Sequence, residues 1–233
     1  MTLEQFKAAY DKPLAVILLG GKRNVANNDK NDLLALGKLL TLTMKHATFR
    51  SGNTGGADAL FCEYVKARHP NRLELILPYS KHRAKQTGMA TTYAVDEIDL
   101  RNEHRVLELI SRNKEHTHLV DIHLGTALRS IVAKAAYMLR DAIKVTGTMS
   151  GILPATAGLF YEDLSNPKAG DTGYTMQMCD AANVPWFDQS VWMPWLDISN
   201  HEVVELLNLI SEAEIRYGNH NLTFNPVPVH CFA

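Results

Sequence analysis

The segment LAVILLGG at residues 14–21 decides the fold of this chain. Its apolar run is continuous, not alternating, which favours a strand buried on both faces, as in a parallel sheet covered by helices. Pro13 precedes the run and the pair Gly20-Gly21 ends it. We therefore expect a buried strand over residues 14–19 with a tight turn directly after it.

The residues that follow repeat an alternation of helix and strand. Leucines at helical spacing predict a helix over 33–44, and residues 47–51 predict a second strand. The turn SGNTGG at 51–56 leads into a helix from residue 57, and LELIL at 73–77 predicts a third strand. Short connections between alternating elements predict an α/β protein with a three-layer Rossmann-like fold, in which helices flank a mostly parallel central sheet.

The second half of the chain has a weaker pattern. We predict a polar loop at 78–92, then helices at 93–113 and 124–139. A strand is expected at 143–148, at 157–161 or at both. A Gly-Asp-Thr-Gly turn at 170–173 precedes another helix, which is followed by a strand at 184–187 and a last helix from Asn200. We expect one domain over residues 1–233. It would have a core at about 14–188, an insertion at about 113–165, and a C-terminal helix and tail at 189–233.

Composition excludes several classes of protein. The 233 residues include 24 basic and 25 acidic side chains, for a net charge of −1, so extended nucleic acid is an unexpected partner. The three cysteines are far apart and suggest neither a disulfide framework nor a cysteine metal site. The N-terminal segment does not resemble a signal peptide and no apolar run is long enough for a membrane span, so we expect a cytoplasmic protein without membrane contact.

Two junctions between a loop and a helix could carry chemistry, at residues 52–58 and 170–175. Each places glycines and hydroxyl side chains before a helix, so that free backbone N–H groups and the positive end of the helix dipole face the same point. Glycine lets a phosphate approach the backbone closely. Neither junction is a Walker loop or a GxGxxG fingerprint, and tight turns alone would also explain the glycines.

Five motifs in this order resemble the SLOG superfamily of Rossmann-like nucleotide-binding proteins. They are LLGGKR, RSGNTGGADAL, LPYSKHR, DLRNEH and GDTGYTMQMCDAANVPWF. The superfamily includes the cytokinin-activating phosphoribohydrolases and the DNA-processing protein of natural transformation, and the likeness is to its small stand-alone members. It implies a ligand-binding site made of Gly20, Gly21, Ser51, Gly52, Gly55, Gly56, Asp58, Arg101, Gly170, Thr172, Gly173 and Thr175, with Arg101 as the cation that meets an anionic ligand.

The resemblance weakens at the residues that would catalyse hydrolysis. In the phosphoribohydrolases the second turn is PGGxGTxxE, whereas here Asp171 replaces a glycine and Gln177 stands at the position of the glutamate. Glutamine cannot shuttle a proton as a carboxylate does. The candidates for a replacement carboxylate are Asp58, Glu103, Asp171 and Asp180.

Three other groups of residues have both a functional and a structural interpretation. His116, His118 and His123 with Asp121 contain metal-ligand types, but their spacing matches no metal pattern, so we predict no metal site. The basic run Lys81, His82, Arg83 and Lys85 is either a solvated loop or a source of charge for the pocket. The aromatic residues Trp186, Phe187, Trp192 and Trp195 fit core or oligomer packing better than base stacking.

The leading hypothesis is a protein that binds a nucleotide or a nucleotide-derived small ligand, as a sensor or as a processing protein. The first alternative is a nucleoside-5′-monophosphate phosphoribohydrolase, and the second is a DNA-binding or protein-assembly module. No cofactor is expected beyond a nucleotide ligand. Homo-oligomerisation stays open.

Overall fold

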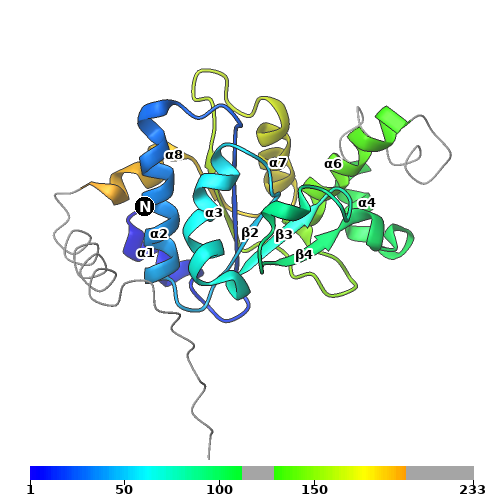
Figure 1. Ribbon diagram of the computed structural model, residues 1–233, viewed down its shortest axis with the longest axis horizontal. Coiled ribbons are helices and arrows are strands. Elements are labelled where there is room, and N and C mark those ends of the chain that lie inside the picture. The colour runs from blue at the N-terminus through cyan, green and yellow to red at the C-terminus, as the bar shows by residue number, and fades with distance from the viewer. Residues whose placement is uncertain (112–128, 198–233) are drawn as a thin grey trace, which may run out of the picture. The chain divides into compact units, whose positions relative to one another are not determined.

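The computed structural model describes residues 1–111 and 129–197, and its centre is a six-stranded parallel sheet (Figure 1). The strands are β1 (Val16–Gly21), β2 (Thr48–Ser51), β3 (Leu73–Leu77), β4 (Thr91–Ala94), β5 (Ala157–Tyr161) and β6 (Trp186–Phe187). They lie in the order β4-β3-β2-β1-β5-β6, and every neighbouring pair is parallel. The chain order therefore reverses between β1 and β5.

Helices cover both faces of this sheet. They are α1 (Leu3–Tyr10), α2 (Lys30–Thr43), α3 (Ala57–Arg68), α4 (His104–Ser111), α6 (Arg129–Thr146), α7 (Gly170–Ala181) and α8 (Gln189–Trp192). Helices α2 and α3 pack together over β1 and β2, whereas α4, α6 and α7 form a second group with the other face (Figure 1). These three layers confirm the predicted α/β Rossmann-like architecture.

The first strand is as buried as its apolar run predicts. Residues 16–19 are each at most 1% exposed, because β1 is central and both faces are covered. The strand begins two residues later than expected, since Leu14 has a left-handed backbone (φ 67°) and is 77% exposed. It also continues through the glycine pair, which pairs with Phe160 and Tyr161 of β5.

In the second half of the chain one prediction is wrong and one of two alternatives is excluded. The segment 93–113 is not one helix: β4 extends to Ala94, short 3-10 turns follow, and α4 begins only at His104. The expected strand at 143–148 belongs mostly to α6, which continues to Thr146. A short apolar run cannot distinguish a buried strand from a buried helix, and Ile143 and Val145 are buried because α6 packs on the sheet and on α7.

Other elements of this half agree with the sequence. The strand at 157–161 is β5, and β6 occupies the second half of the expected strand at 184–187. The Gly-Asp-Thr-Gly motif is the first turn of α7 itself and not a turn before it. Of the aromatic residues, Trp192 and Trp195 are buried and Trp186 and Phe187 are partly buried, and Phe6 contacts both Phe187 and Trp195.

Residues Met1–Leu196 form one compact unit and Asp197–Ala233 a second. The helix expected from Asn200, the tail, and the histidines at 116, 118 and 123 lie outside the described residues. The single domain over 1–233 stays a prediction. Within the described ranges, no helix has the length and apolar character needed to cross a membrane.

Candidate functional site

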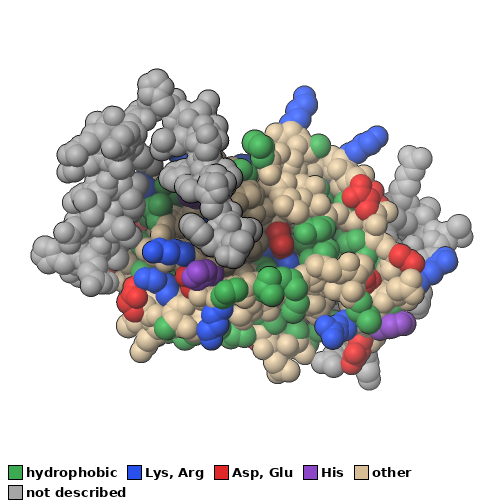
Figure 2. Space-filling view, turned by 90° about the horizontal axis from the view of Figure 1, so that it is seen from below, with side chains coloured by type: hydrophobic (Ala, Val, Ile, Leu, Met, Phe, Trp, Pro, Cys, Tyr) green, Lys and Arg blue, Asp and Glu red, His purple; other side chains and the backbone are tan. Residues whose placement is uncertain are grey.

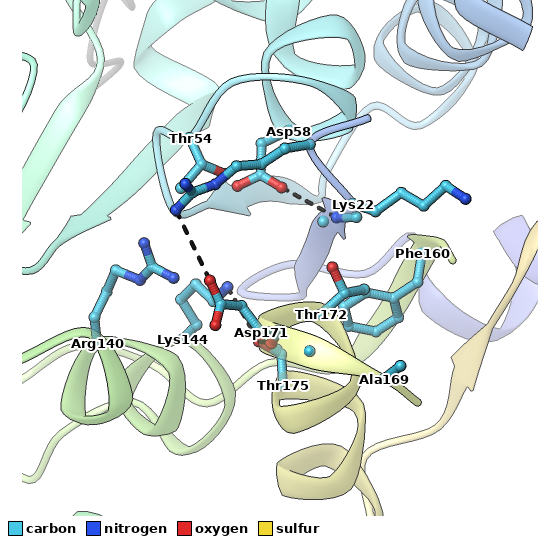
Figure 3. A pocket seen from close by; sticks show the side chains of 14 residues that line it. Lys22, Thr54, Asp58, Arg140, Lys144, Phe160, Ala169, Asp171, Thr172 and Thr175 are labelled. Carbon is cyan, nitrogen blue, oxygen red and sulfur yellow. Dashed lines mark hydrogen bonds and ion pairs between the residues drawn. The ribbon is translucent and has the colours of Figure 1, made fainter. Parts of the chain in front are cut away.

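A pocket of about 350 Å³ opens at the carboxyl ends of β1 and β5, where the chain order of the sheet reverses. Ligands of open α/β sheets bind at such a point because the loops after the two strands diverge there. The loop after β1 and the first turns of α3 and α7 meet here, and α6 closes one side (Figure 3). The lining residues are Gly20, Gly21, Lys22, Arg23, Thr54, Asp58, Arg140, Lys144, Phe160, Ala169, Gly170, Asp171, Thr172 and Thr175.

Asp58 connects two glycine-rich segments beside the pocket, the end of β1 at Gly20-Gly21 and the turn at residues 51–56. It lies in the first turn of α3, is 4% exposed, and accepts hydrogen bonds from Gly21 N at 3.1 Å and from Gly52 N at 3.3 Å. A buried backbone N–H needs an acceptor, and this carboxylate provides one for each segment. These two N–H groups are therefore already occupied by the protein itself.

Arg140 and Lys144 on α6 line one side of the pocket, and together with Asp141 behind them they form a buried charged group. The Asp141 carboxylate lies 2.7 Å from Arg140 Nη2 and 2.9 Å from Lys144 Nζ, and all three side chains are at most 5% exposed. Burial raises the pKa of Asp141, but the two cations outweigh this effect and hold its pKa below the usual range. Asp141 is therefore ionised at neutral pH.

Arg140 keeps one donor free. Burial lowers its pKa, but the Asp141 carboxylate, with Asp58 further away, more than reverses this effect and raises it. Its Nε and Nη2 donate to Asp141, whereas Nη1 is buried and has no hydrogen-bond partner among the described residues. A charged donor in this situation costs folding free energy unless a ligand or an ordered water molecule accepts from it.

Lys144 connects this charged group to the start of α7. Its Nζ donates to Thr175 Oγ1 at 3.4 Å, and the Thr175 hydroxyl donates to the Asp171 carbonyl at 3.3 Å. No side chain caps the N-terminus of α7, so its first backbone N–H groups remain open toward the pocket. Figure 3 shows Arg140 and Lys144 on one side of the pocket, with Asp171 beside Lys144, and Thr172 and Phe160 on the other side.

Two exposed ion pairs lie at the rim. Arg23 Nη2 is 3.8 Å from Asp171 Oδ2, and Lys22 Nζ is 3.8 Å from Asp163 Oδ2. The first pair joins the loop after β1 to the first turn of α7 across the pocket (Figure 3). Exposed pairs at this distance contribute at most about 1 kcal/mol, so they exchange readily for an anionic ligand.

The structure brings half of the expected ligand-binding residues to this pocket: Gly20, Gly21, Asp58, Gly170, Thr172 and Thr175. Ser51 and Gly55 instead line a smaller cavity of about 220 Å³ that shares Thr54 and Asp58 with the pocket. Gly52 lies between Arg140 and Asp58, because a Cβ there would be 3.2 Å from Arg140 Cζ and 3.4 Å from Asp58 Oδ2.

Gly56 and Gly173 are required by packing between loops. Gly56 has a left-handed backbone (φ 79°), and a Cβ there would collide with the backbone of Arg23. A Cβ on Gly173 would collide with the carbonyl group of Lys168. Their role is therefore to let neighbouring segments approach, whereas Gly170 is open, since a Cβ there would have nothing within 4 Å.

Three expected site residues lie elsewhere. Arg101 is exposed in a 3-10 turn (Leu100–Asn102) and lines none of the described cavities. Glu103 is buried and accepts hydrogen bonds from the backbone of Met149 and Ser150. Asp180 binds Lys168 and the Trp186 indole at the other end of α7.

The basic run after β3 divides between two environments. Lys81 and Lys85 are exposed, and Arg83 lines the smaller cavity. His82 is 7% exposed and packs edge-on against Tyr79 and Tyr137. Burial lowers its pKa, and so do nearby arginines, which keeps the ring neutral at pH 7.

Sequence reasoning missed the cations that line the pocket, which are Lys22, Arg23, Arg140 and Lys144. A signal exists for the last two: they lie with Asp141 inside residues 135–145, where almost every other side chain is apolar. Charges inside an apolar helix are rarely buried without a partner, so such a group indicates a buried polar network.

The described residues contain neither a cluster of metal-ligand side chains nor a reactive cysteine. Over residues 1–111 and 129–197, no group of three or more His, Cys, Asp or Glu side chains could hold a metal ion. Cys62 and Cys179 are free and buried. Burial raises the pKa of each thiol to about 12, so neither is a nucleophile at neutral pH.

No protein-family model matches this sequence, and no curated protein matches it. Among solved structures, DNA processing protein A from Helicobacter pylori, whose single-stranded DNA binding mode has been described, is similar with a TM-score of 0.45 and 14% sequence identity. The match covers 76% of this chain and 66% of that one, so this chain spans less than two thirds of that protein. The likeness is too distant to carry an argument about function.

Proposed function

We propose that the pocket at the ends of β1 and β5 binds a nucleotide or a nucleotide-derived small ligand through its phosphate. The observation that carries this proposal is Arg140 Nη1, a buried cationic donor without a partner among the described residues. A phosphate oxygen is the acceptor that suits it best, because hydrogen bonds between charged groups are about twice as strong as neutral ones.

The rest of the pocket fits the same ligand. The open N-terminus of α7 adds backbone donors and the positive end of a helix dipole, and Lys144 adds a second cation. Phe160 gives the wall an apolar surface, and Thr54 and Thr172 add hydroxyl groups. A volume of about 350 Å³ suits a small organic ligand better than a bare ion.

The hydrolase alternative now depends on one residue. Asp58 and Asp171 are the carboxylates that line the pocket among the described residues, and both oxygens of Asp58 accept backbone hydrogen bonds. Asp171 is exposed, and Arg23 is its ion-pair partner among the described residues. Release of free base from nucleoside monophosphates, abolished by Asp171→Asn, would support hydrolysis in place of binding alone.

The DNA-binding alternative gains no support from surface charge. On the face shown in Figure 2, basic and acidic side chains of the described residues are interspersed and do not form a basic stripe. Proteins that bind extended nucleic acid concentrate Lys and Arg on one face.

A thermal-shift screen with nucleoside monophosphates, cyclic nucleotides, NAD and ADP-ribose tests the proposal. A ligand at 100 times its dissociation constant stabilises the fold by about 2.7 kcal/mol. Arg140→Gln removes that stabilisation, because the amide cannot replace the charged donor, whereas Arg105→Gln, which removes one exposed positive charge from α4, retains it. An unchanged shift in Arg140→Gln would overturn the proposal.

A further inference from the structure

The smaller cavity, of about 220 Å³, lies beside the turn at residues 51–56 and adjoins the pocket. The two share Thr54 and Asp58, so one ligand can reach both by crossing this turn. Its floor is apolar and consists of Leu73, Leu75 and Cys62. Its rim belongs to α3 and to the loop after β3, and neither segment contributes to the phosphate-binding wall on α6.

Two cations stand at the rim of this cavity. Lys66 on α3 donates to the Gln86 carbonyl at 3.2 Å, and the guanidinium of Arg83 lies over Gly55, where a Cβ would be 3.4 Å from Nη1. Neither cation forms an ion pair with a carboxylate in the part of the chain that the structure describes. The described lining of the cavity therefore has a net positive charge, two cations against the carboxylate of Asp58.

A buried polar group also faces this cavity. Ser51 is fully buried at the end of β2, lines the cavity, and its hydroxyl has no hydrogen-bond partner among the described residues. The nearby thiol of Cys62 is at best a weak partner. An unsatisfied buried hydroxyl requires an explanation, and a ligand oxygen in the cavity would supply its missing hydrogen bond.

The backbone holds Arg83 in a specific position. Arg83 has a left-handed conformation (φ 46°), as does Asn53 (φ 53°), and Asn53 Nδ2 donates to the Arg83 carbonyl at 3.5 Å. Left-handed conformations are unfavourable for side chains such as arginine and persist only where the surroundings enforce them. This contact fixes the loop after β3 against the turn that separates the two cavities.

We propose that the smaller cavity holds a second anionic group of the same ligand, so that the ligand is a nucleotide with two separate phosphate groups. This inference rests on the proposed function, since Arg140 and α7 hold the first phosphate. Arg83 and Lys66 bind the second phosphate, and the Ser51 hydroxyl donates to one of its oxygens. The sugar crosses the turn at Thr54, which borders both cavities.

Calorimetric titration with two probes tests this inference. The probes are adenosine 5′-monophosphate and adenosine 3′,5′-bisphosphate, and the wild-type protein binds the bisphosphate about tenfold more tightly, since one charge-assisted contact has about that value. Arg83→Gln and Lys66→Gln each lower the ratio of the two affinities, and the double variant brings it to about one. Arg105→Gln, matched in charge change at an exposed residue that lines neither cavity, keeps the ratio of the wild-type protein. Thermal melting confirms that each variant is folded.

Each outcome has a distinct meaning. If the wild-type protein binds both probes with equal affinity, the second phosphate site is overturned and the proposed function stands. A bisphosphate preference that survives both substitutions also overturns the site, because the preference then comes from charge in general. If the wild-type protein binds neither probe, both the inference and the adenine-nucleotide form of the proposed function fail.

Discussion

The two glycine-rich segments, Gly20-Gly21 at the end of β1 and the turn at residues 51–56, contribute to the same pocket as helix α6, but in the opposite way. These segments carry the recognisable motif, yet Asp58 satisfies a backbone N–H group in each of them. Helix α6 carries no motif, yet it presents a buried guanidinium with one donor unused. A glycine motif thus marks where segments approach, whereas the free binding capacity comes from side chains whose sequence pattern is ordinary.

The largest expected loss of stability comes from a change in the buried charged group on α6. Asp141→Asn leaves two buried cations, Arg140 and Lys144, without their shared carboxylate. Removing one partner of a buried ionic group costs about 3–5 kcal/mol of unfolding free energy. Urea denaturation followed by circular dichroism measures the loss. The control Glu97→Gln, at an exposed position, changes stability by less than about 0.5 kcal/mol, and an equal loss in both variants would contradict a structural role for the group on α6.

A smaller loss of stability is expected from a change of Asp58, which connects the two glycine-rich segments. Asp58→Ala removes the acceptor of Gly21 N and Gly52 N, and two buried donors left unsatisfied cost about 1–3 kcal/mol. The same denaturation experiment measures the loss. If inorganic phosphate restores part of this stability to Asp58→Ala and none to the wild-type protein, the carboxylate and a phosphate compete for these N–H groups. A variant as stable as the wild-type protein would show that these segments do not depend on Asp58.

The fold was largely predictable because its signals are local. The apolar run of β1, the leucines of α2 and the LELIL segment of β3 each determine an element from their own spacing. Failures occurred where tertiary packing decides: Ile143 and Val145 are apolar because α6 is buried, and β4 forms because it pairs with the edge of β3. Neither fact is present in the residues alone.

The site was predictable only where backbone geometry leaves a mark in the sequence. Glycine turns at the ends of β1 and β2 located the pocket, because only small residues allow the close approach of these segments. Arg140 and Lys144 reach the pocket from a helix more than 80 residues further along the chain. The sequence instead pointed to Arg101, which shares the expected residue type but lies on an exposed turn.

Asp11 is a second carboxylate that accepts hydrogen bonds from the backbone of a neighbouring loop, and it is remote in the sequence from the glycine-rich segments. It accepts hydrogen bonds from the backbone N–H groups of Lys45, His46 and Ala47 at 2.8–3.0 Å. Partial burial raises its pKa, but these three donors outweigh the effect and leave the pKa below its usual value. Asp11→Asn is expected to cost about 1 kcal/mol at neutral pH.

The pH dependence of the stability difference between the wild-type and Asp11→Asn proteins tests whether the ionised carboxylate is its source. Because the folded-state pKa of Asp11 is lowered, its contribution is fully present above the unfolded-state pKa of about 4 and is lost as the pH falls through the lower folded-state pKa. Wild-type and Asp11→Asn proteins should therefore differ in melting temperature at neutral pH and converge in acid. A difference that stays constant into acid would exclude the carboxylate as its source.

The smallest expected change in stability is that of Arg101→Ala, and comparing this variant with Arg140→Gln tests which of the two arginines binds the ligand. Arg101→Ala removes an exposed side chain, so stability changes by less than about 0.5 kcal/mol, and any ligand-induced thermal shift persists. Arg140→Gln removes that shift, because its Nη1 is the buried donor beside Gly52 and Asp58. The measurement is the same ligand titration on both variants. If the shift is lost in Arg101→Ala alone, the anion binds at the Arg101 motif that the sequence suggested. If it is lost in Arg140→Gln alone, the anion binds at α6, where a buried charged donor is unused although no motif marks it.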